Sequence, residues 1–266
     1  MILYWSDSPW PSLWSVRPDG SNRRRAYRSH QNAKRPSASP GGRWIAFDGA
    51  PPETPPLTEF DIQVVGTDGS GLRSLTSSHA VQIDARWSPD GSTLAFTSWP
   101  ANSDWRHSTI WTVGFEGGNL RRLGRGQAAR WSPDGRRLVF DVTTEGDDGD
   151  LFVMDADGSH RQRLLAAPGI DQAAAWSPNG TRILFTRFED AGRSDVFLAD
   201  VAGTHVCRLT GLGDAIAGSW SPDGSRIVFT SVLDGRSTVH VMDADGSHRR
   251  PVPGGTTEEF DPSWGP

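Results

Sequence analysis

The sequence predicts an all-β protein, a six-bladed β-propeller built from four-stranded antiparallel blades. The first observation is a repeated motif, Trp-Ser-Pro-Asp-Gly, which begins at Trp87, Trp131 and Trp220 and, with Asn in place of Asp, at Trp176. The second is the spacing of these tryptophans, 44 or 45 residues, which is typical of propeller blades and repeat arrays. The third is that no stretch shows the 3.6-residue periodicity of a helix, which excludes a helical solenoid.

Two degenerate copies of the motif bring the count to six. One ends the chain at residues 263–266, and the other, at residues 38–42, lacks the Trp and the Asp. Because the repeats fill the chain from one end to the other, residues 1–266 are predicted to form one propeller domain of six repeats, without a linker.

The elements follow one another in the same order in every repeat. The Pro-Asp-Gly turn precedes a short alternating run rich in β-branched and aromatic residues, which predicts a strand, as at residues 138–141 and 183–186. A variable loop then leads to a second run and an Asp-x-Asp-Gly hairpin, as at residues 151–158, and a last run leads to the next motif. With the strand that ends in the Trp, each repeat has the four strands of one propeller blade.

The two ends of the chain predict how the ring closes. Residues 2–5 align with the second strand of a blade, and residues 260–264 align with the first strand. The C-terminal strand is therefore expected to complete the N-terminal blade, which removes the open sheet edges that a linear array would expose.

This pattern resembles the TolB-like propeller family, whose WD-repeat-like unit reads Asp-Pro-x-Trp-Ser-Pro-Asp-Gly, then two strands and an Asp-x-Asp-Gly hairpin. Residues 261–264 match the first part of the unit, and residues 154–158 match the hairpin. The resemblance covers essentially the whole chain and implies the fold. It implies no particular activity, since the relatives include a cell-envelope protein that binds partner proteins and propeller domains that cap peptidases; it favours a binding role.

Composition limits the partners and the location. The net charge is −5 and no long run of one sign occurs, so nucleic acid is set aside as a partner. No stretch approaches the roughly 18 apolar residues of a membrane span, and no signal peptide is seen. We therefore expect a monomer without membrane insertion, cytoplasmic if the chain is full length and exported if it is a trimmed mature domain. Cys207 cannot form an internal disulfide and is expected to be buried.

The residues that differ between repeats predict a charged sector in the central channel. Side chains alternate along a strand, so the residues one, three and five places before each motif position are expected to share one face of the innermost strand. In the blade closed by the C-terminus and the next two blades they are Ser263, Asp261, Glu259, Ser37, Arg35, Ala33, Arg86, Asp84 and Gln82. In the other three blades they are mainly small: Arg130, Ala128, Gly126, Ala175, Ala173, Asp171, Ser219, Ala217 and Ala215.

Loop residues that break the repeat fall in the same sector. The loops between the second and third strands of the first three blades hold Trp10, Trp99 and Trp105, and His30 and His79 lie eight residues before the motif position on adjacent interblade connections. In antiparallel blades these loops and connections share one face, so the aromatic side chains and histidines are expected around one entrance to the channel.

Two functions remain open. The first is a binding or scaffold propeller that holds a protein segment or a small ligand at this entrance. Arginine pairs with carboxylates and phosphates through parallel hydrogen bonds, so an anionic ligand is expected. The ligand-binding candidates are Arg35, Arg86, Arg130, Trp10, Trp99 and Trp105. The charged residues could instead pair only with one another and merely satisfy the channel.

The alternative function is a small-molecule enzyme, a lyase, cyclase or hydrolase, at the same entrance. Histidines near carboxylates are suited to acid-base catalysis, and the candidates are His30, His79, Asp84, Arg86, Glu259 and Asp261. No motif with a built-in catalytic mechanism occurs, so a binding role is favoured.

The sequence predicts no cofactor and no metal site. The acidic stretch at residues 145–150 has the oxygen ligands that calcium prefers, but it lacks the full loop with a terminal Glu that an EF-hand requires. A solvated hairpin tip is therefore favoured over a calcium site.

Overall fold

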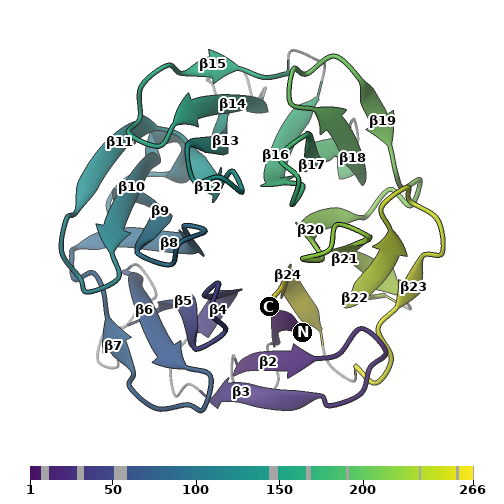
Figure 1. Cartoon of the computed structure of the whole chain (residues 1–266), viewed down its shortest axis with the longest axis horizontal. Coiled ribbons are helices and arrows are strands. Elements are labelled where there is room, and N and C mark those ends of the chain that lie inside the picture. The colour runs from purple at the N-terminus through teal and green to yellow at the C-terminus, as the bar shows by residue number, and fades with distance from the viewer. Residues whose placement is uncertain are drawn as a thin grey trace.

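The computed structural model describes residues 1–6, 12–28, 33–50, 59–143, 149–165, 169–189, 192–233, 235–255 and 258–265. These residues form six four-stranded antiparallel sheets set around a central channel (Figure 1). No α-helix occurs in these ranges; a short 3-10 helix, Trp105–His107, lies between two strands of one blade. The prediction of an all-β, six-bladed propeller is confirmed.

Each blade has one strand at the channel and one at the outer rim, and the blades follow the order of the chain (Figure 1). Blade 1 contains β24 (Glu259–Trp264), β1 (Ile2–Ser6), β2 (Ser12–Val16) and β3 (Arg24–Arg28). Blade 2 contains β4 (Ala33–Ala38), β5 (Trp44–Gly49), β6 (Asp61–Gly66) and β7 (Arg73–Ser74). Blade 3 contains β8 (Ala80–Trp87), β9 (Thr93–Pro100), β10 (Thr109–Gly114) and β11 (Arg121–Arg125).

Blades 4 to 6 repeat this arrangement. Blade 4 contains β12 (Gln127–Trp131), β13 (Arg137–Thr143), β14 (Gly149–Asp155) and β15 (Gln162–Arg163). Blade 5 contains β16 (Ile170–Trp176), β17 (Arg182–Phe188), β18 (Ser194–Asp200) and β19 (Val206–Arg208). Blade 6 contains β20 (Ile216–Trp220), β21 (Arg226–Leu233), β22 (Arg236–Asp243) and β23 (Arg250–Pro251).

The second strand of every blade supplies a fully buried aromatic side chain to the core. These residues are Tyr4, Phe47, Phe96, Phe140, Phe185 and Phe229. The apolar side chains gather in clusters formed by residues of neighbouring blades, as where Phe96 and Trp87 of blade 3 pack with Ile62 and Val64 of blade 2. Removing such side chains from water on both faces of each sheet is the main source of stability for the ring.

The Trp-Ser-Pro-Asp-Gly motif is a hydrogen-bonded turn at the end of the innermost strand. In blade 4, Ser132 Oγ donates to Asp134 Oδ1 at 2.6 Å and accepts from the backbone N–H of Arg137 at 2.9 Å. Gly135 has a φ of 70°, which glycine adopts at little cost. The motif therefore recurs because every blade needs the same tight connection between its first two strands.

In blades 3, 4 and 5 the motif tryptophan ties the blade to the one before it. The indole N–H of Trp87 donates to the carbonyl of Ser37 at 3.1 Å, that of Trp131 to Arg86 at 3.2 Å, and that of Trp176 to Arg130 at 3.1 Å. In these blades the acceptor lies one place before the motif position of the preceding blade. Trp220 and Trp264 make no such bond and contribute by packing in the apolar clusters.

The ring closes through the C-terminal strand. β24 pairs with β1 in antiparallel register, with Ile2 opposite Trp264 and Ser6 opposite Glu259. The last and the first strand of the chain therefore share one blade, and the predicted closure is confirmed (Figure 1).

One prediction about the rim is wrong. Cys207 is exposed, although it was expected to be buried. It lies in β19, the outermost strand of blade 5, which has a neighbouring strand on one side only. In the described ranges no helix is long and apolar enough to cross a membrane.

Candidate binding site in the central channel

The channel contains a cavity of about 390 Å³, which we call the channel cavity. Its wall includes residues one and three places before the motif positions, from all six blades. The members at these places are Arg35, Ser37, Asp84, Arg86, Ala128, Arg130, Ala175, Ala217, Ser219, Asp261 and Ser263. The arginines and aspartates among them come from blades 1 to 4, whereas blades 5 and 6 contribute small side chains.

The residues five places before the motif do not share this face, contrary to the expectation from strand alternation. In blade 3, Ile83 pairs with Thr97 and Arg86 with Ala95, so Asp84 and Ala85 together stand opposite Phe96. This is a β-bulge, and it shifts the alternation by one residue. The residues four places before the motif therefore line the cavity instead: Ile83, Gln127, Gln172 and Ile216.

The bulge rests on a left-handed residue three places before the motif. The φ angles are 49° at Arg35, 60° at Asp84, 53° at Ala128 and 47° at Asp261. Such a conformation costs a non-glycine residue about 1 to 2 kcal/mol. It turns the backbone N–H toward the second strand of the preceding blade, where Ala128 N donates to Thr97 Oγ1 at 2.9 Å and Asp84 N to Asp48 Oδ1 at 2.7 Å.

Glu259 is the candidate residue that the bulge removes from the channel. Its side chain is 1% exposed and accepts hydrogen bonds from Arg23, which immediately precedes β3, and, at 3.1 Å, from the backbone N–H of Val239 in blade 6. Burial, and then the charge of Glu259, raise the pKa of the adjacent Tyr4. Glu259 therefore belongs to the joint between blades 1 and 6.

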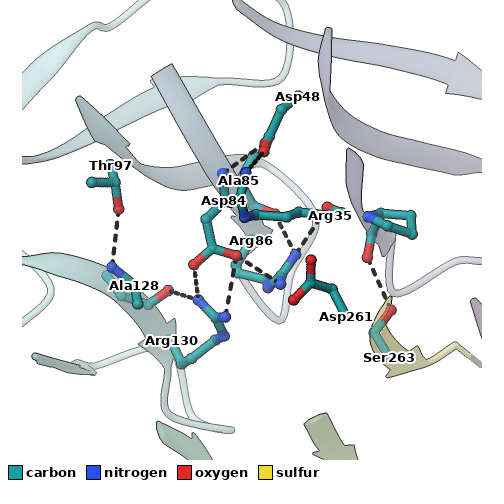
Figure 2. A network of polar contacts seen from close by, with 12 residues as sticks. Arg35, Asp48, Asp84, Ala85, Arg86, Thr97, Ala128, Arg130, Asp261 and Ser263 are labelled. Carbon is teal, nitrogen blue, oxygen red and sulfur yellow. Dashed lines mark hydrogen bonds and ion pairs between the residues drawn. The ribbon is translucent and has the colours of Figure 1, made fainter. Parts of the chain in front are cut away.

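The charged side chains of the channel form a connected network (Figure 2). Arg130 donates to Asp84 from Nη1 at 2.7 Å and from Nη2 at 3.2 Å, and Arg86 Nη2 lies 2.7 Å from Asp84 Oδ1. Arg35 Nη1 donates to Asp48 Oδ2 at 2.8 Å. Burial acts to raise the pKa of Asp84, but Arg130 and Arg86 outweigh it and hold that pKa below its usual value.

Arg86 and Arg130 share the carboxylate of Asp84, and each has N–H donors that this carboxylate does not use. Arg86 Nη1 donates to the carbonyls of Arg35 and Ala85, both at 3.2 Å, and Arg130 Nη1 also donates to the carbonyl of Ala129. A guanidinium has five N–H donors, so each arginine keeps Nε and one Nη2 hydrogen without an acceptor among the described residues. Burial and the proximity of Arg130 lower the pKa of Arg86 to about 10, so Arg86 stays charged at neutral pH.

Asp261 completes the charged sector from the closing strand. Its Oδ2 accepts a hydrogen bond from the indole N–H of Trp5 at 2.8 Å, and its carboxylate points toward the arginines in Figure 2. Because Trp5 is neutral, this bond orients Asp261 without cancelling its charge. The sector therefore presents both cations and an anion to the cavity.

The opposite sector of the cavity leaves space. Ala175, Ala217 and Gly218 line it, and Ile216 at its edge is 40% exposed. A Cβ atom on Gly218 would lie 2.6 Å from the carbonyl oxygen of Pro262, so no larger residue fits where blades 6 and 1 meet. A ligand with a charged part and an apolar part fits a cavity with one charged and one small-residue wall.

Of the histidine and tryptophan candidates, His79, Trp99 and Trp105 are described, and none of these three lines the channel cavity. The side chain of His79 is 97% exposed and lies 3.2 Å from Glu59 Oε1. Trp99 is half-buried in β9, and Trp105 is 39% exposed in the short helix, beside Arg125 and Gly126. Trp10 and His30 lie outside the described residues. The structure thus brings together Arg35, Asp84, Arg86, Arg130 and Asp261, but neither His79 nor Glu259 with them.

Two features were missed by the sequence interpretation. One is Asp48, which, like Asp141 of blade 4, occupies the place where Thr97 and Thr186 stand in blades 3 and 5; this departure from threonine was a usable signal. The other is a second cavity, of about 420 Å³, at the end of the channel where the motif turns lie. We call it the turn-side mouth. Its wall includes Pro40, Pro89, Pro222, Trp87, Trp131, Trp176 and Trp264, and Arg86 and Arg130 line both cavities.

The structure adds little about metals. Within the described ranges, no group of three or more His, Cys, Asp or Glu side chains is placed to hold a metal ion. Residues 145–148 of the acidic stretch lie outside these ranges, so calcium binding there stays a prediction.

Six closed blades around an arginine-rich cavity define a six-bladed β-propeller in which repeated residues build the ring and irregular residues are free for recognition. The chain belongs to the TolB β-propeller domain family, whose model matches residues 52–266. Both the fold and the repeat unit therefore agree with the resemblance read from the sequence.

Individual relatives match less of the chain. A Tol-Pal system protein TolB from Anaeromyxobacter dehalogenans is 34% identical over 114 residues, which are 42% of this chain and 25% of the relative. The crystal structure of TolB from Acinetobacter baumannii has a TM-score of 0.84 at 20% identity and covers all of this chain and 66% of the other. A putative TolB from Agrobacterium tumefaciens has a TM-score of 0.74 at 22% identity, over 94% and 87% of the two chains. At these identities the two structures show a shared fold.

Proposed function

We propose that this propeller is a binding scaffold that holds a protein segment in its channel cavity, with Arg86 and Arg130 receiving a carboxylate of that segment. The observation that carries the proposal is that two buried arginines share the single carboxylate of Asp84 and keep Nε and Nη2 donors beside an open cavity. Charge-assisted, bidentate hydrogen bonds to a carboxylate are among the strongest polar contacts that such donors make.

A protein partner is favoured over a metabolite by the relatives, which are named as proteins of the Tol-Pal system. The small-residue wall at Ala175, Ala217 and Gly218 leaves space for an apolar side chain next to the carboxylate. An enzyme is not favoured, because His79 and Glu259, two of the catalytic candidates, lie away from the cavity among the described residues.

Location and assembly follow as parts of the same proposal. Of the two locations expected from the sequence, the TolB relatives support export and give no support to the cytoplasm. We propose that the propeller acts as a monomer, because its ring is closed by its own strands and leaves no innermost edge for a second copy. Light scattering after size-exclusion chromatography measures this directly.

Selection of short random peptides on the purified protein tests the binding site. The selected peptides are expected to share an acidic residue next to an apolar one. In Arg130→Gln, their affinity should fall about tenfold to a hundredfold, the loss expected when a charged hydrogen-bond donor is removed.

Arg187→Gln is the matched control for this experiment. Arg187 also pairs with a buried carboxylate, Asp171, at 2.7 Å, but neither residue lines the channel cavity. Its replacement should leave peptide affinity unchanged. Equal losses of peptide affinity in both variants, or selected peptides without a shared acidic residue, would contradict the proposal. If a small anion displaced none of the peptides, the peptides would bind outside the channel cavity.

A further inference from the structure

We infer, resting on the anion site proposed above, that an anion in the channel cavity draws Arg35 away from Asp48 and that Asp48 takes up a proton in exchange. The affinity of the site for anions then rises as the pH falls through neutrality. Asp48 would be a positioning residue, since it acts on the ligand through Arg35.

The fold does not need a carboxylate at position 48. This place in the second strand accepts the backbone N–H of the residue three places before the motif in the next blade. Thr97 accepts from Ala128 and Thr186 accepts from Ala217, at 2.9 and 2.8 Å, with a neutral hydroxyl. Asp48 accepts the same hydrogen bond from the N–H of Asp84, so this bond does not require the negative charge of Asp48.

That charge is matched by one partly exposed cation, Arg35. Asp48 has no exposed surface, and its Oδ2 accepts from Arg35 Nη1 at 2.8 Å. The side chain of Arg35 is 35% exposed and lines the channel cavity, so its guanidinium lies between a buried carboxylate and the space for a ligand. A carboxylate left buried without a cation is costly and takes a proton instead.

The other charges near Asp48 come from each neighbouring strand. β4 contributes Arg35 and β8 contributes Asp84 and Arg86, while Asp261 of β24 acts on Arg35 from the adjacent blade 1. On β6, Asp61 lies within 3.5 Å of Thr76 Oγ1, which donates to it. Asp84 and Asp261 therefore compete with Asp48 for the arginines. Arg86, the other arginine near Asp48, is already paired with Asp84 at 2.7 Å.

The sign of the coupling follows from these contacts. Burial raises the pKa of Asp48 to about 7, and Asp84 adds to the rise, whereas Arg35 acts to lower it. Removing Arg35 therefore raises the pKa of Asp48 further, so the complex binds a proton that the free protein lacks above neutral pH. Uptake of one proton strengthens binding by at most about tenfold per pH unit, and the effect vanishes once Asp48 is already protonated in the free protein.

Sulfate is a suitable probe, because its own charge is constant over the relevant range of about pH 6 to 8.5. The carboxyl carbon of Asp48 is followed by NMR with and without sulfate, and sulfate affinity is measured across this range. In the wild type, sulfate should raise the midpoint of the Asp48 titration, and its affinity should increase severalfold as the pH falls from about 8.5 to about 7.

Asp48→Asn should bind sulfate with an affinity that is nearly independent of pH. Asp48→Thr, the residue of the equivalent places in blades 3 and 5, gives the same test if the Asn variant fails to fold. Asp171→Asn, which removes a buried carboxylate outside the cavity, should keep the wild-type pH dependence.

The two proposals fail in different ways. If sulfate binds and Arg130→Gln weakens it, but wild type and Asp48→Asn show the same pH slope, the proton coupling is refuted while the anion site stands. If sulfate leaves the Asp48 titration unchanged, the coupling is refuted as well. If sulfate binding does not respond to Arg130→Gln at any pH, the anion site itself is overturned.

Discussion

At the scale of single residues, the motif tryptophans and Trp105 differ in how much they contribute to stability. Trp176 is 7% exposed and donates to the carbonyl of Arg130, whereas Trp105 is 39% exposed in a short helix and lies over the guanidinium of its neighbour Arg106. A buried indole that links two blades contributes both apolar burial and a satisfied hydrogen bond. An exposed one contributes little of either.

Trp176, which is buried, and Trp131, which is partly buried, both donate to the preceding blade. Trp131→Ala and Trp176→Ala should therefore each reduce the free energy of unfolding by about 3 to 5 kcal/mol, the usual loss for a large aromatic removed from a core. Trp105→Ala should cost less than about 1 kcal/mol. Urea denaturation of the three variants measures the difference, and equal losses at all three positions would show that the motif tryptophans do not hold the blades together.

Counting back from the motif located most of the charged residues of the channel but misplaced Glu259. Arg35, Asp84, Arg86, Arg130 and Asp261 were placed in one sector of the channel by counting back from the motif, and the structure puts them there. Glu259 was placed wrongly, because the count assumed a regular strand. The bulge is set by a left-handed residue, and Arg, Asp and Ala at that place carry no local signal for it.

At the scale of elements, the joint between β24 and blade 6 depends on a buried ion pair. Glu259 is bonded to Arg23, which immediately precedes β3, and to the backbone of β22, so it joins the two ends of the chain to the neighbouring blade. Strand periodicity predicts that β24 pairs with β1. It gives no information about the side chains that hold their sheet against blade 6.

Glu259→Ala should reduce the free energy of unfolding by about 3 to 5 kcal/mol, because it leaves Arg23 largely buried without a counter-charge. Glu116→Ala is the control: Glu116 is 89% exposed and 3.9 Å from Arg73, and its loss should cost less than about 1 kcal/mol. Thermal melting monitored by circular dichroism separates the two variants. Similar melting of both would mean that strand pairing alone closes the ring.

At the scale of the whole molecule, the repeat fixes the number of blades and the closure, and these were predictable because identical residues recur in every unit. The conformation of the long loops was not predictable, since these loops differ from blade to blade and share no sequence pattern. The position of the chain ends is a property of this scale too: the N–H of Gly265 donates to the carbonyl of Met1 at 2.8 Å, so the ends lie side by side.

A circular permutant tests whether the ring depends on where the chain is cut. Joining the present ends through a short linker and opening the chain between Asp134 and Gly135, in the motif turn of blade 4, should preserve the fold and change the melting temperature by only a few degrees, about the shift that 1 kcal/mol produces. Far-ultraviolet circular dichroism and melting provide the measurement. A permutant that fails to fold would show that the present cut, and not ring closure alone, is required.

The adjacency of the two chain ends also decides how the molecule is presented when it is anchored. Gly265 lines the turn-side mouth, and Met1 lies next to it. An affinity handle or surface linker attached at either end therefore sits at the Pro- and Trp-lined side of the ring. On a sensor surface, both attachments turn the same face toward the support and leave the other opening of the channel toward the solution, so the choice of handle does not select which side an analyte meets.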